Sequence, residues 1–481
     1  MGWESIPEMV LSAADRFGGA EAVVDGPVRL SFAELADRVA AAAGAFAAAG
    51  IEKGDRAAIW APNSAEWIIA AFGLLTAGGI LVPINTRFKA EEASDILRRS
   101  GAKAVLVQQG FLSLDGEAQK AAGAAGGLPV IDLKSDFLAS GSPLRRAVSG
   151  DDVGDIIFTS GTTGRPKGVM MTHAQNLEWT VNWCDTVGLR EGDRYLIVNP
   201  FFHMFGYKAG CITSLIRGAT ILPVPVFDVE QVLELVEREK VTVLPGPPTL
   251  YHSLLSAETD RDLSTLRVAV TGSADIPVEL IRRVSTELPF QSIFTGYGLT
   301  EAGTVTLSRT GDSFEDIATT VGTPCPGYEV RIADDGEVLV SGLGVMKGYL
   351  DDPAATVQAI DAQGWLHTGD LGSLDDNGRL RILGRKKDMF IVGGFNAYPA
   401  EIEGFLLEHP AVAQVAVVGV PDERLGQVGK AFVVAHGPVT EDELIAWSRD
   451  RMAGFKAPRY VQFLAELPLS ATGKVLKDQL R

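Results

Sequence analysis

The feature that most constrains the fold is a short apolar run at residues 156–158 that passes directly into a loop crowded with glycine and hydroxyl side chains. Glycine lets backbone amides approach a phosphate group, hydroxyls donate hydrogen bonds to it, and a lysine balances its charge. This arrangement predicts a strand that ends in a phosphate-binding loop. The residues expected to bind nucleotide there are Thr159, Ser160, Gly161, Thr162, Thr163, Gly164 and Lys167.

Other interpretations of glycine-rich segments fit less well. A Walker A loop requires a second glycine immediately before its lysine, but Pro166 holds that position and Gly168 follows the lysine. An ordinary surface turn needs only one or two glycine or hydroxyl residues. The glycines at residues 342–346 do not match GxGxxG at the start of a helix, so we do not interpret them as a dinucleotide site.

The first part of the chain predicts a layered α/β domain. Helix and strand signals alternate up to about residue 330, which is typical of a largely parallel sheet. Ser31 and Glu34 form a capping box at the start of a helix that runs to Ala49. Further expected elements are a helix at 65–77 and strands at 55–60, 102–107, 220–223, 241–244 and 266–271. We expect surface connections at 110–150 and hairpin-rich β structure at 328–341 and 378–392.

The pattern changes after a charged cluster at residues 385–388. A compact α+β pattern follows, with helices expected at 399–407 and 441–451 and strands at 412–420 and 429–435. Two domains also suit the length of 481 residues, which exceeds the size at which single cores stop growing. We therefore predict an α/β fold class: a large layered α/β N-terminal domain with a β-rich part (1–386) and a small α+β C-terminal domain (387–481).

Composition excludes some classes of function. The net charge of −18 argues against nucleic-acid binding, which depends on clustered Lys and Arg. Cys184, Cys211 and Cys325 are widely spaced and predict neither a disulfide framework nor a zinc site, so the cytoplasm is the expected location. The first residues contain no signal-peptide pattern. Glycine and proline breakers in the uncharged stretch 67–84 predict a buried helix, a turn and a strand, and we expect no transmembrane segment.

The phosphate loop and five later motifs, in this order, resemble the adenylate-forming superfamily, which contains acyl-CoA synthetases, luciferases and the adenylation domains of peptide synthetases. Residues 272–274 (Gly272, Ser273, Ala274) are similar to the adenine-side loop of the superfamily, and 297–301 to its second nucleotide motif. Residues 365–370 and 384–388 are similar to the ribose and hinge motifs, and 468–474 to the C-terminal lysine motif. The resemblance covers about three hundred residues and implies the superfamily's two-domain fold, with a C-terminal domain that is mobile.

The resemblance assigns a role to each motif, and ATP, Mg²⁺ and coenzyme A follow as cofactors and co-substrate. Tyr297 offers a flat face for adenine, with Gly298 beside it. Thr300 supplies a catalytic hydrogen bond to phosphate, and Glu301 a hard oxygen ligand for Mg²⁺. The ribose hydroxyls are expected to bind Asp370, with Arg385 nearby, and Lys474 to bind the nucleotide during catalysis.

The two half-reactions use different parts of the C-terminal domain in this superfamily. Lys474 stabilises the negative charge that develops when the carboxylate attacks the α-phosphate. The domain then rotates about a hinge, here Lys387, and brings Gly393 and Gly394 to the tunnel for the CoA thiol. Glycine at these positions suits a tight turn and the close passage of pantetheine.

The acyl pocket of the superfamily uses the segment around residues 200–210, where His203 matches the catalytic gate residue between pocket and CoA tunnel. Tyr207 and Lys208 are polar for a fatty-acid pocket, whose walls are expected to be apolar. The run through Lys208 is similar to actinobacterial ligases of steroid catabolism that act on an indanedione propionate. We expect Tyr207 or Lys208 to contact the ketones of such a substrate.

The expected activity is therefore that of an ATP-dependent carboxylic acid–CoA ligase, an acyl-CoA synthetase that forms an acyl-adenylate and then the CoA thioester. A medium-chain fatty acid or an aryl acid stays open as substrate, and so does a stand-alone adenylation enzyme that loads a carrier-protein thiol. The expected partners are a small carboxylic acid, ATP and CoA; a homodimer is left open by the sequence.

Overall fold

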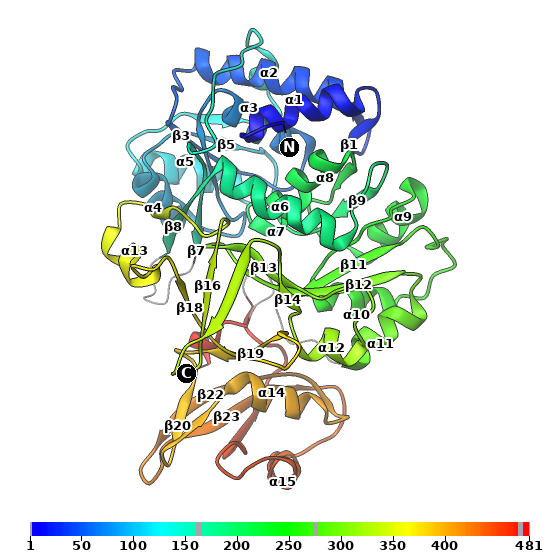
Figure 1. The fold of residues 1–481 in the computed structure, drawn as a ribbon, viewed down its shortest axis with the longest axis vertical. Helices are drawn as coiled ribbons and strands as arrows, with labels where there is room; N and C mark the ends of the chain where they lie inside the picture. The colour runs from blue at the N-terminus through cyan, green and yellow to red at the C-terminus, as the bar shows by residue number, and fades with distance from the viewer. Residues whose placement is uncertain (1, 160–165, 273–277, 470–474, 481) are drawn as a thin grey trace.

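The computed structural model describes residues 2–159, 166–272, 278–469 and 475–480. Figure 1 shows a large N-terminal domain in which helices cover the sheets, and a smaller C-terminal group, coloured orange to red, at one end of the molecule. This architecture is the predicted large α/β domain with a β-rich part, followed by a small α+β domain.

The main sheet of the large domain has the strand order β17–β8–β7–β4–β3–β5–β6. The strands from β7 to β6 run parallel, and β8 and β17 extend that edge with antiparallel pairing. The predicted strands at 55–60 and 102–107 are confirmed. The bounds are β3 Arg56–Trp60, β4 Ile80–Pro83, β5 Ala102–Val107, β6 Val130–Asp132, β7 Val153–Thr159, β8 Lys167–Thr172 and β17 Gly348–Tyr349.

A second sheet consists of two halves, β2–β1–β10–β9 and β11–β12–β13–β14, which meet at Val243. Val243 bridges Tyr195 of β9 and Val268 of β11. The strand predicted at 241–244 is thus shorter than expected, since Pro245, which lacks an amide donor, follows directly. The bounds are β1 Glu21–Asp25, β2 Val28–Ser31, β9 Arg194–Ile197, β10 Thr220–Pro223, β11 Val268–Gly272, β12 Ser292–Leu299, β13 Gly303–Leu307 and β14 Thr323–Pro324.

A third, antiparallel sheet has the order β15–β16–β18–β19 and connects the large domain to the C-terminal domain. Its bounds are β15 Tyr328–Ile332, β16 Glu337–Gly342, β18 Leu366–Leu374 and β19 Leu380–Arg385. The hairpin predicted within 328–341 is confirmed. The β structure predicted at 378–392 is confirmed, and it lies in two sheets: β19 pairs with β18, and β20 (Phe390–Val392) pairs with strands of the C-terminal domain.

Helices pack against these sheets. The N-terminal half contains α1 Ile6–Phe17, α2 Phe32–Ala48, α3 Ala65–Thr76, α4 Ala90–Ser100, α5 Leu114–Ala124 and α6 His173–Val187. The remaining helices of the large domain are α7 Met204–Gly206, a π-helix at Tyr207–Ile212, α8 Thr213–Arg217, α9 Val229–Glu239, α10 Pro248–Ser256, α11 Val278–Glu287, α12 Phe314–Thr319 and α13 Pro353–Ala359.

Close packing of α2 on α3 accounts for the uncharged stretch at 67–84. A Cβ atom on Gly73 of α3 would lie 2.6 Å from the Ala42 side chain of α2, so a larger residue would push the helices apart. The stretch consists of most of α3, a turn and β4, as predicted, and the Ser31–Glu34 capping box also forms. Among the described residues, no helix combines the length and apolar character needed to cross a membrane.

The prediction of surface connections at 110–150 is wrong. The segment contains α5, the edge strand β6 and a 3₁₀ turn at Asp136–Ala139. Ala118, Ala121 and Ala122 of α5 are buried in one core with strand β5. Because alanine and glycine contribute little to hydrophobic periodicity, the pattern of this helix was too weak to identify.

The C-terminal domain follows the predicted order of elements. Its bounds are β20 Phe390–Val392, β21 Phe395–Ala397, α14 Pro399–Leu407, β22 Val412–Asp422, β23 Gly426–Ala435, α15 Glu441–Arg451 and β24 Tyr460–Phe463, followed by a 3₁₀ turn at Lys477–Gln479. A separate core forms around Ile402, Val417 and Val433. Figure 1 shows α14 on the side of this domain that faces β19, and the two elements are in contact.

A buried histidine at the start of α6 makes the stability of the large domain depend on pH. His173 Nδ1 accepts a hydrogen bond from the Ile6 amide of α1 at 3.4 Å. Burial lowers the pKa of His173 from 6.5 to about 4. In the unfolded chain, His173 becomes protonated near pH 6.5, whereas in the folded chain it stays neutral down to about pH 4. The free energy of unfolding therefore decreases as the pH falls through this range.

We predict that His173→Asn, which keeps an acceptor for the Ile6 amide, flattens this pH dependence. Between about pH 7 and about pH 5, the wild type should lose about 2 kcal/mol more unfolding free energy than the variant, from the difference in histidine pKa between the two states. Urea denaturation of both proteins at the two pH values measures the difference. Equal losses in both proteins would contradict the prediction.

Candidate active site

The phosphate loop lies at the tip of a hairpin between two strands of the main sheet. Strands β7 and β8 pair antiparallel, and their last pair is Thr159 with Lys167. The sequence prediction of a strand that runs into the loop is confirmed. Ser160, Gly161, Thr162, Thr163 and Gly164 lie outside the described residues, but the hairpin brings both ends of the loop together at the same edge of the sheet.

A second hairpin, between β12 and β13, carries the next predicted motif. Tyr297 and Gly298 are in β12, and an irregularity in the pairing falls between them. Such bulges redirect side chains and are common beside active sites. Thr300 and Glu301 follow in the turn, which Gly303 closes with a φ of +69°. A Cβ on Gly303 would lie 2.6 Å from the Trp179 ring, so the turn requires glycine.

The adenine-side and ribose motifs meet at Tyr297. Gly272 ends β11 and pairs in register with Gly296 of β12, directly before Tyr297, whereas Ser273 and Ala274 lie outside the described residues. The Tyr297 hydroxyl donates to Asp370 Oδ2 at 2.5 Å. Burial raises the pKa of Tyr297, and the neighbouring carboxylate adds to this shift, so the phenol stays a proton donor.

Asp370 is also held by Arg385 across the β18–β19 ladder. The two residues pair directly, and Arg385 Nε lies 2.7 Å from Asp370 Oδ1. The Asp370 side chain is buried, whereas that of Arg385 is more than two-fifths exposed. Both oxygens of the Asp370 carboxylate thus have a partner, and one of these partners is a partly exposed arginine. The sequence-predicted group Tyr297, Asp370 and Arg385 is therefore in mutual contact.

A tyrosine that the sequence analysis missed connects the phosphate loop to the Glu301 turn. The Tyr349 hydroxyl donates to Glu301 Oε1 at 3.1 Å, and Lys167 Nζ lies 4.8 Å from the centroid of the Tyr349 ring. Burial raises the pKa of Tyr349, and Glu301 raises it further. Tyr349 lies in a short edge strand opposite Val169. The sequence shows only a Gly-Tyr pair there, which was too short to predict this strand.

The Glu301 carboxylate suits a magnesium ion. Among the described residues, Tyr349 hydrogen-bonds to Oε1 of this side chain and none donates to Oε2. Within the described ranges, no group of three or more His, Cys, Asp or Glu residues could hold a metal. One hard oxygen beside a phosphate loop fits Mg²⁺, which takes most of its ligands from phosphate and water.

His203 lies where the chain leaves β9 and turns into α7. Its Nδ1 accepts a hydrogen bond from the Phe205 amide at 3.2 Å and so caps α7. Buried Asn63 fixes the preceding loop: it accepts a hydrogen bond from the Phe201 amide at 2.7 Å and donates to the Ile197 carbonyl at 3.1 Å. Asn63 follows β3 at the carboxyl edge of the sheet, a placement the sequence analysis did not use.

The structure gives the expected contact of Lys208 with substrate no support, because the ammonium of Lys208 is paired inside the protein. Lys208 Nζ lies 2.8 Å from Asp155 Oδ1, and both side chains are at most 2% exposed. Asn176 Nδ2 donates to the other oxygen of Asp155 at 2.5 Å. Burial lowers the pKa of Lys208, and the attraction of Asp155 opposes that shift. An isolated Asp in the apolar strand at 153–159 was the signal that could have revealed this pair.

Tyr207 precedes Lys208 at the start of the π-helix and is fully buried against Trp67 and Phe72. Its hydroxyl finds no hydrogen-bond partner among the described residues. A buried hydroxyl without a partner costs about 1–3 kcal/mol, which makes Tyr207 the remaining candidate for a polar contact in the acyl region.

The predicted hinge residue lies where the two domains join, and the predicted CoA residues lie in a turn of the C-terminal domain. Lys386 is anchored to the large domain through Asp335 and Glu337 at 2.7 and 3.0 Å. Lys387 follows and is exposed. Gly393 and Gly394 form the β20–β21 turn with φ of +58° and +91°, conformations that favour glycine. Lys474 lies outside the described residues.

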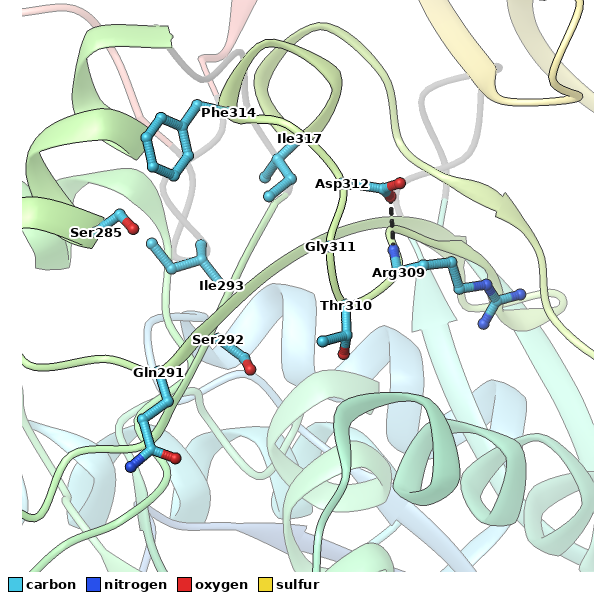
Figure 2. Close-up of a pocket in the computed structure, with 10 residues that line it drawn as sticks. All are labelled: Ser285, Gln291, Ser292, Ile293, Arg309, Thr310, Gly311, Asp312, Phe314 and Ile317. Atoms are coloured by element: carbon cyan, nitrogen blue, oxygen red, sulfur yellow. Dashed lines mark hydrogen bonds between the residues drawn. The ribbon is translucent and has the colours of Figure 1, made fainter.

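A separate small cavity of about 110 Å³ lies beside α11 and α12. Figure 2 shows that the Arg309 guanidinium points away from the other lining residues, and it donates to the Pro324 carbonyl at 2.9 Å. The cavity contains none of the site residues predicted from the sequence, so we do not assign it to the reaction.

Comparison with known proteins agrees with this geometry. The model of the AMP-binding enzyme family matches residues 11–350, and that of the AMP-binding enzyme C-terminal domain matches 401–474. A 3-[(3aS,4S,7aS)-7a-methyl-1,5-dioxo-octahydro-1H-inden-4-yl]propanoyl:CoA ligase of Rhodococcus jostii (strain RHA1) is 48% identical over 99% of this chain and 98% of its own. A ligase of the same name from Mycobacterium tuberculosis (strain ATCC 25618 / H37Rv) is 48% identical over 94% of each chain.

Solved structures of CoA synthetases have the same fold. The o-succinylbenzoate CoA synthetase of Bacillus subtilis in complex with ATP and magnesium ion has a TM-score of 0.88 and 32% identity, with 98% of each chain covered. The chain belongs to the AMP-binding enzyme family. Within the family it is an acid–CoA ligase, which uses ATP with magnesium to form an acyl-adenylate and then transfers the acyl group to CoA.

The buried Asp155–Lys208 pair generates a stability prediction. Lys208→Met should destabilise the protein by about 3–5 kcal/mol, because it leaves the Asp155 carboxylate buried without a counter-ion. The double variant Asp155→Asn/Lys208→Met removes both charges and should recover most of that loss. Urea denaturation measures all three proteins. Lys53→Met, which breaks a largely exposed pair with Asp152, is the control and should cost less than about 1 kcal/mol. A double variant as unstable as the single one would contradict the prediction.

Proposed function

We propose that this ligase activates a propionate attached to a ketone-bearing ring system, the kind of acid in the names of its Rhodococcus and Mycobacterium relatives. The observation that carries the proposal is 48% identity to both relatives along almost the whole chain. A feruloyl-CoA synthase of Amycolatopsis is less similar, at 39% identity over 96% of the chain. An aryl or medium-chain acid is the alternative substrate, and a carrier-protein thiol is the alternative acceptor.

The contacts around Tyr297 support the proposed nucleotide roles. Its ring provides a face for adenine, while Asp370 accepts the ribose hydroxyls and Arg385 balances the charge of that carboxylate. The 160–164 loop, Lys167 and Thr300 would bind the phosphates, and Glu301 would hold Mg²⁺. The ion, when bound, neutralises charge on the phosphate oxygens.

In the first half-reaction, a carboxylate oxygen of the acid attacks the α-phosphorus, and the bond to the bridging oxygen breaks to release pyrophosphate. Lys474 stabilises the charge that develops on the transferring and leaving oxygens. In the second, the CoA sulfur attacks the acyl carbonyl carbon and AMP leaves. His203 separates the acyl pocket from the thiol tunnel, and Gly393 and Gly394 give pantetheine room to pass.

Movement between these half-reactions requires a hinge, which we place at Lys387, between domains of residues 1–386 and 387–481. Support comes from the anchoring of Lys386 to Asp335 and Glu337, directly before an exposed residue. We place the reaction in the cytoplasm, where the buried free thiols of Cys184, Cys211 and Cys325 would stay reduced.

In the acyl pocket, we propose that the Tyr207 hydroxyl donates to a ketone of the substrate. This hydroxyl is buried and has no partner among the described residues, whereas Lys208 is already paired with Asp155. A keto-bearing ring would satisfy the hydroxyl, and a linear fatty acid would leave it unpaired.

We predict that the wild type has a higher kcat/KM for a diketo ring propionate than for decanoate, and that Tyr207→Phe lowers only the first value, by about tenfold. The measurement is pyrophosphate release for both acids, with CoA present and withheld. Tyr195→Phe is the matched control: it removes another buried hydroxyl, which donates to the Ala209 carbonyl, and should affect both acids equally. A wild-type preference for decanoate, with no selective effect of Tyr207→Phe, would exclude the ring substrate while leaving the ligase activity intact.

The hinge generates a separate prediction. Lys387→Pro should leave adenylate formation nearly unchanged but block thioester formation, since proline fixes φ near −65° and prevents the rotation. The two half-reactions are measured by pyrophosphate exchange and by CoA thioester synthesis from presynthesised adenylate. Asp376→Pro, in the exposed turn between β18 and β19, is the control and should spare both. Unchanged thioester synthesis in Lys387→Pro would place the hinge elsewhere.

A further inference from the structure

Tyr349 occupies a position between two groups of opposite charge that belong to different motifs. Its hydroxyl reaches Glu301 Oε1 at 3.1 Å, while Lys167 Nζ lies 4.8 Å from the centroid of its ring. The hydroxyl hydrogen bond fixes one carboxylate oxygen and directs the other away. The ring face attracts the ammonium group through its quadrupole. One side chain thus contacts both the end of the phosphate loop and the metal-binding turn.

Backbone contacts hold Tyr349 on both sides, so the position of its Cα atom, from which the side chain extends, is fixed. The residue pairs with Val169 of β8, two positions after Lys167. Its amide donates to Thr356 Oγ1 at 2.9 Å, and the following Leu350 amide donates to the Gly168 carbonyl at 2.8 Å. Because β8 carries both Lys167 and the partner of Tyr349, the phenol and the ammonium keep their spacing.

The same segment also holds the backbone of Glu301. The Met346 amide donates to the Glu301 carbonyl at 2.7 Å, and Gln175 of α6 fixes the preceding residue by donating to the Val345 carbonyl at 2.6 Å. Glu301 is therefore attached to residues 345–350 at its main chain and at one carboxylate oxygen. No described residue donates a hydrogen bond to its Oε2, the oxygen that we assign to a ligand.

We propose that Tyr349 is a positioning residue for the magnesium–triphosphate group: it orients Glu301 toward the ion and keeps Lys167 at the phosphates. The inference rests on the proposed role of Glu301 as metal ligand. Hydrogen bonds to ligating carboxylates are part of metal sites generally, and their loss costs about 10- to 100-fold in metal affinity or activity.

Two substitutions separate the two contacts. Tyr349→Phe removes the hydroxyl and keeps the ring face for Lys167, so it should weaken metal binding alone. Tyr349→Leu removes both and should additionally weaken the binding of ATP without metal. The matched control is Tyr328→Phe, which removes a hydroxyl that donates to the carbonyl of Ala302, the neighbour of Glu301, at 2.5 Å. It disturbs the same turn without touching the Glu301 carboxylate or Lys167.

The experiment measures Mn²⁺ binding by electron paramagnetic resonance in the presence of a non-hydrolysable ATP analogue and without any acid, so the result does not depend on which acid is the substrate. Tyr349→Phe should weaken Mn²⁺ binding about tenfold, and Tyr328→Phe should leave it unchanged. The Mg²⁺ concentration for half-maximal pyrophosphate exchange should rise in parallel, whereas the KM for CoA stays constant. In a Glu301→Gln background, Tyr349→Phe should have no further effect on Mn²⁺ binding.

Wild-type affinity in Tyr349→Phe, or an equal loss in Tyr328→Phe, would overturn the inference and leave the proposed function standing. An additive effect of Tyr349→Phe in the Glu301→Gln background would overturn it as well, because the hydroxyl would then act independently of that carboxylate. If Glu301→Gln itself binds Mn²⁺ like the wild type, the proposed metal role of Glu301 fails and the inference fails with it.

Discussion

A fully buried ion pair joins the strand that ends in the phosphate loop to the helix that follows His203. Asp155 is on β7 and Lys208 is in the π-helix, and their charged groups are 2.8 Å apart without access to water. Neither charge could stay buried alone, since removal of one partner costs about 3–5 kcal/mol. The pair therefore ties the position of the phosphate loop to that of the acyl region. A π-helix at this point is consistent with a local functional constraint.

The nucleotide side of the site depends on a different interaction, a hydrogen bond from a tyrosine hydroxyl to a carboxylate. Tyr297 donates to Asp370 and Tyr349 donates to Glu301, and in both cases burial raises the pKa of the phenol so that it keeps its proton. Tyr349 fixes the Glu301 carboxylate through one oxygen, whereas Tyr297 and Arg385 together hold both oxygens of Asp370. Under the proposed function, this arrangement would orient the carboxylates for ribose and for a cation before the nucleotide binds, which reduces the ordering that binding requires.

The local sequence pattern predicted the helices and strands that are marked by large apolar side chains or by helix-capping residues. The Ser31–Glu34 capping box, strand β5 and helices α14 and α15 appear at the expected residues. Helix α5 was missed because its buried face consists of Ala118, Ala121 and Ala122, which weigh little in hydrophobic periodicity. The sequence predicted β structure at 378–392 but not which strands pair there, because strand pairing is a long-range property that periodicity does not contain.

The sequence by itself determined the phosphate loop, the order of the nucleotide motifs and the division into a large and a small domain, because these depend on residue types at short spacing. It also indicated Tyr297, Asp370 and Arg385, which the fold brings into contact. Only the tertiary structure decided what Lys208 and Tyr349 do. Both lie far along the chain from their partners, by 53 residues for Lys208 and Asp155 and by 48 for Tyr349 and Glu301. Whether a buried lysine faces a substrate or a carboxylate depends on which strand packs against its helix, and that is fixed only when the sheets and helices assemble.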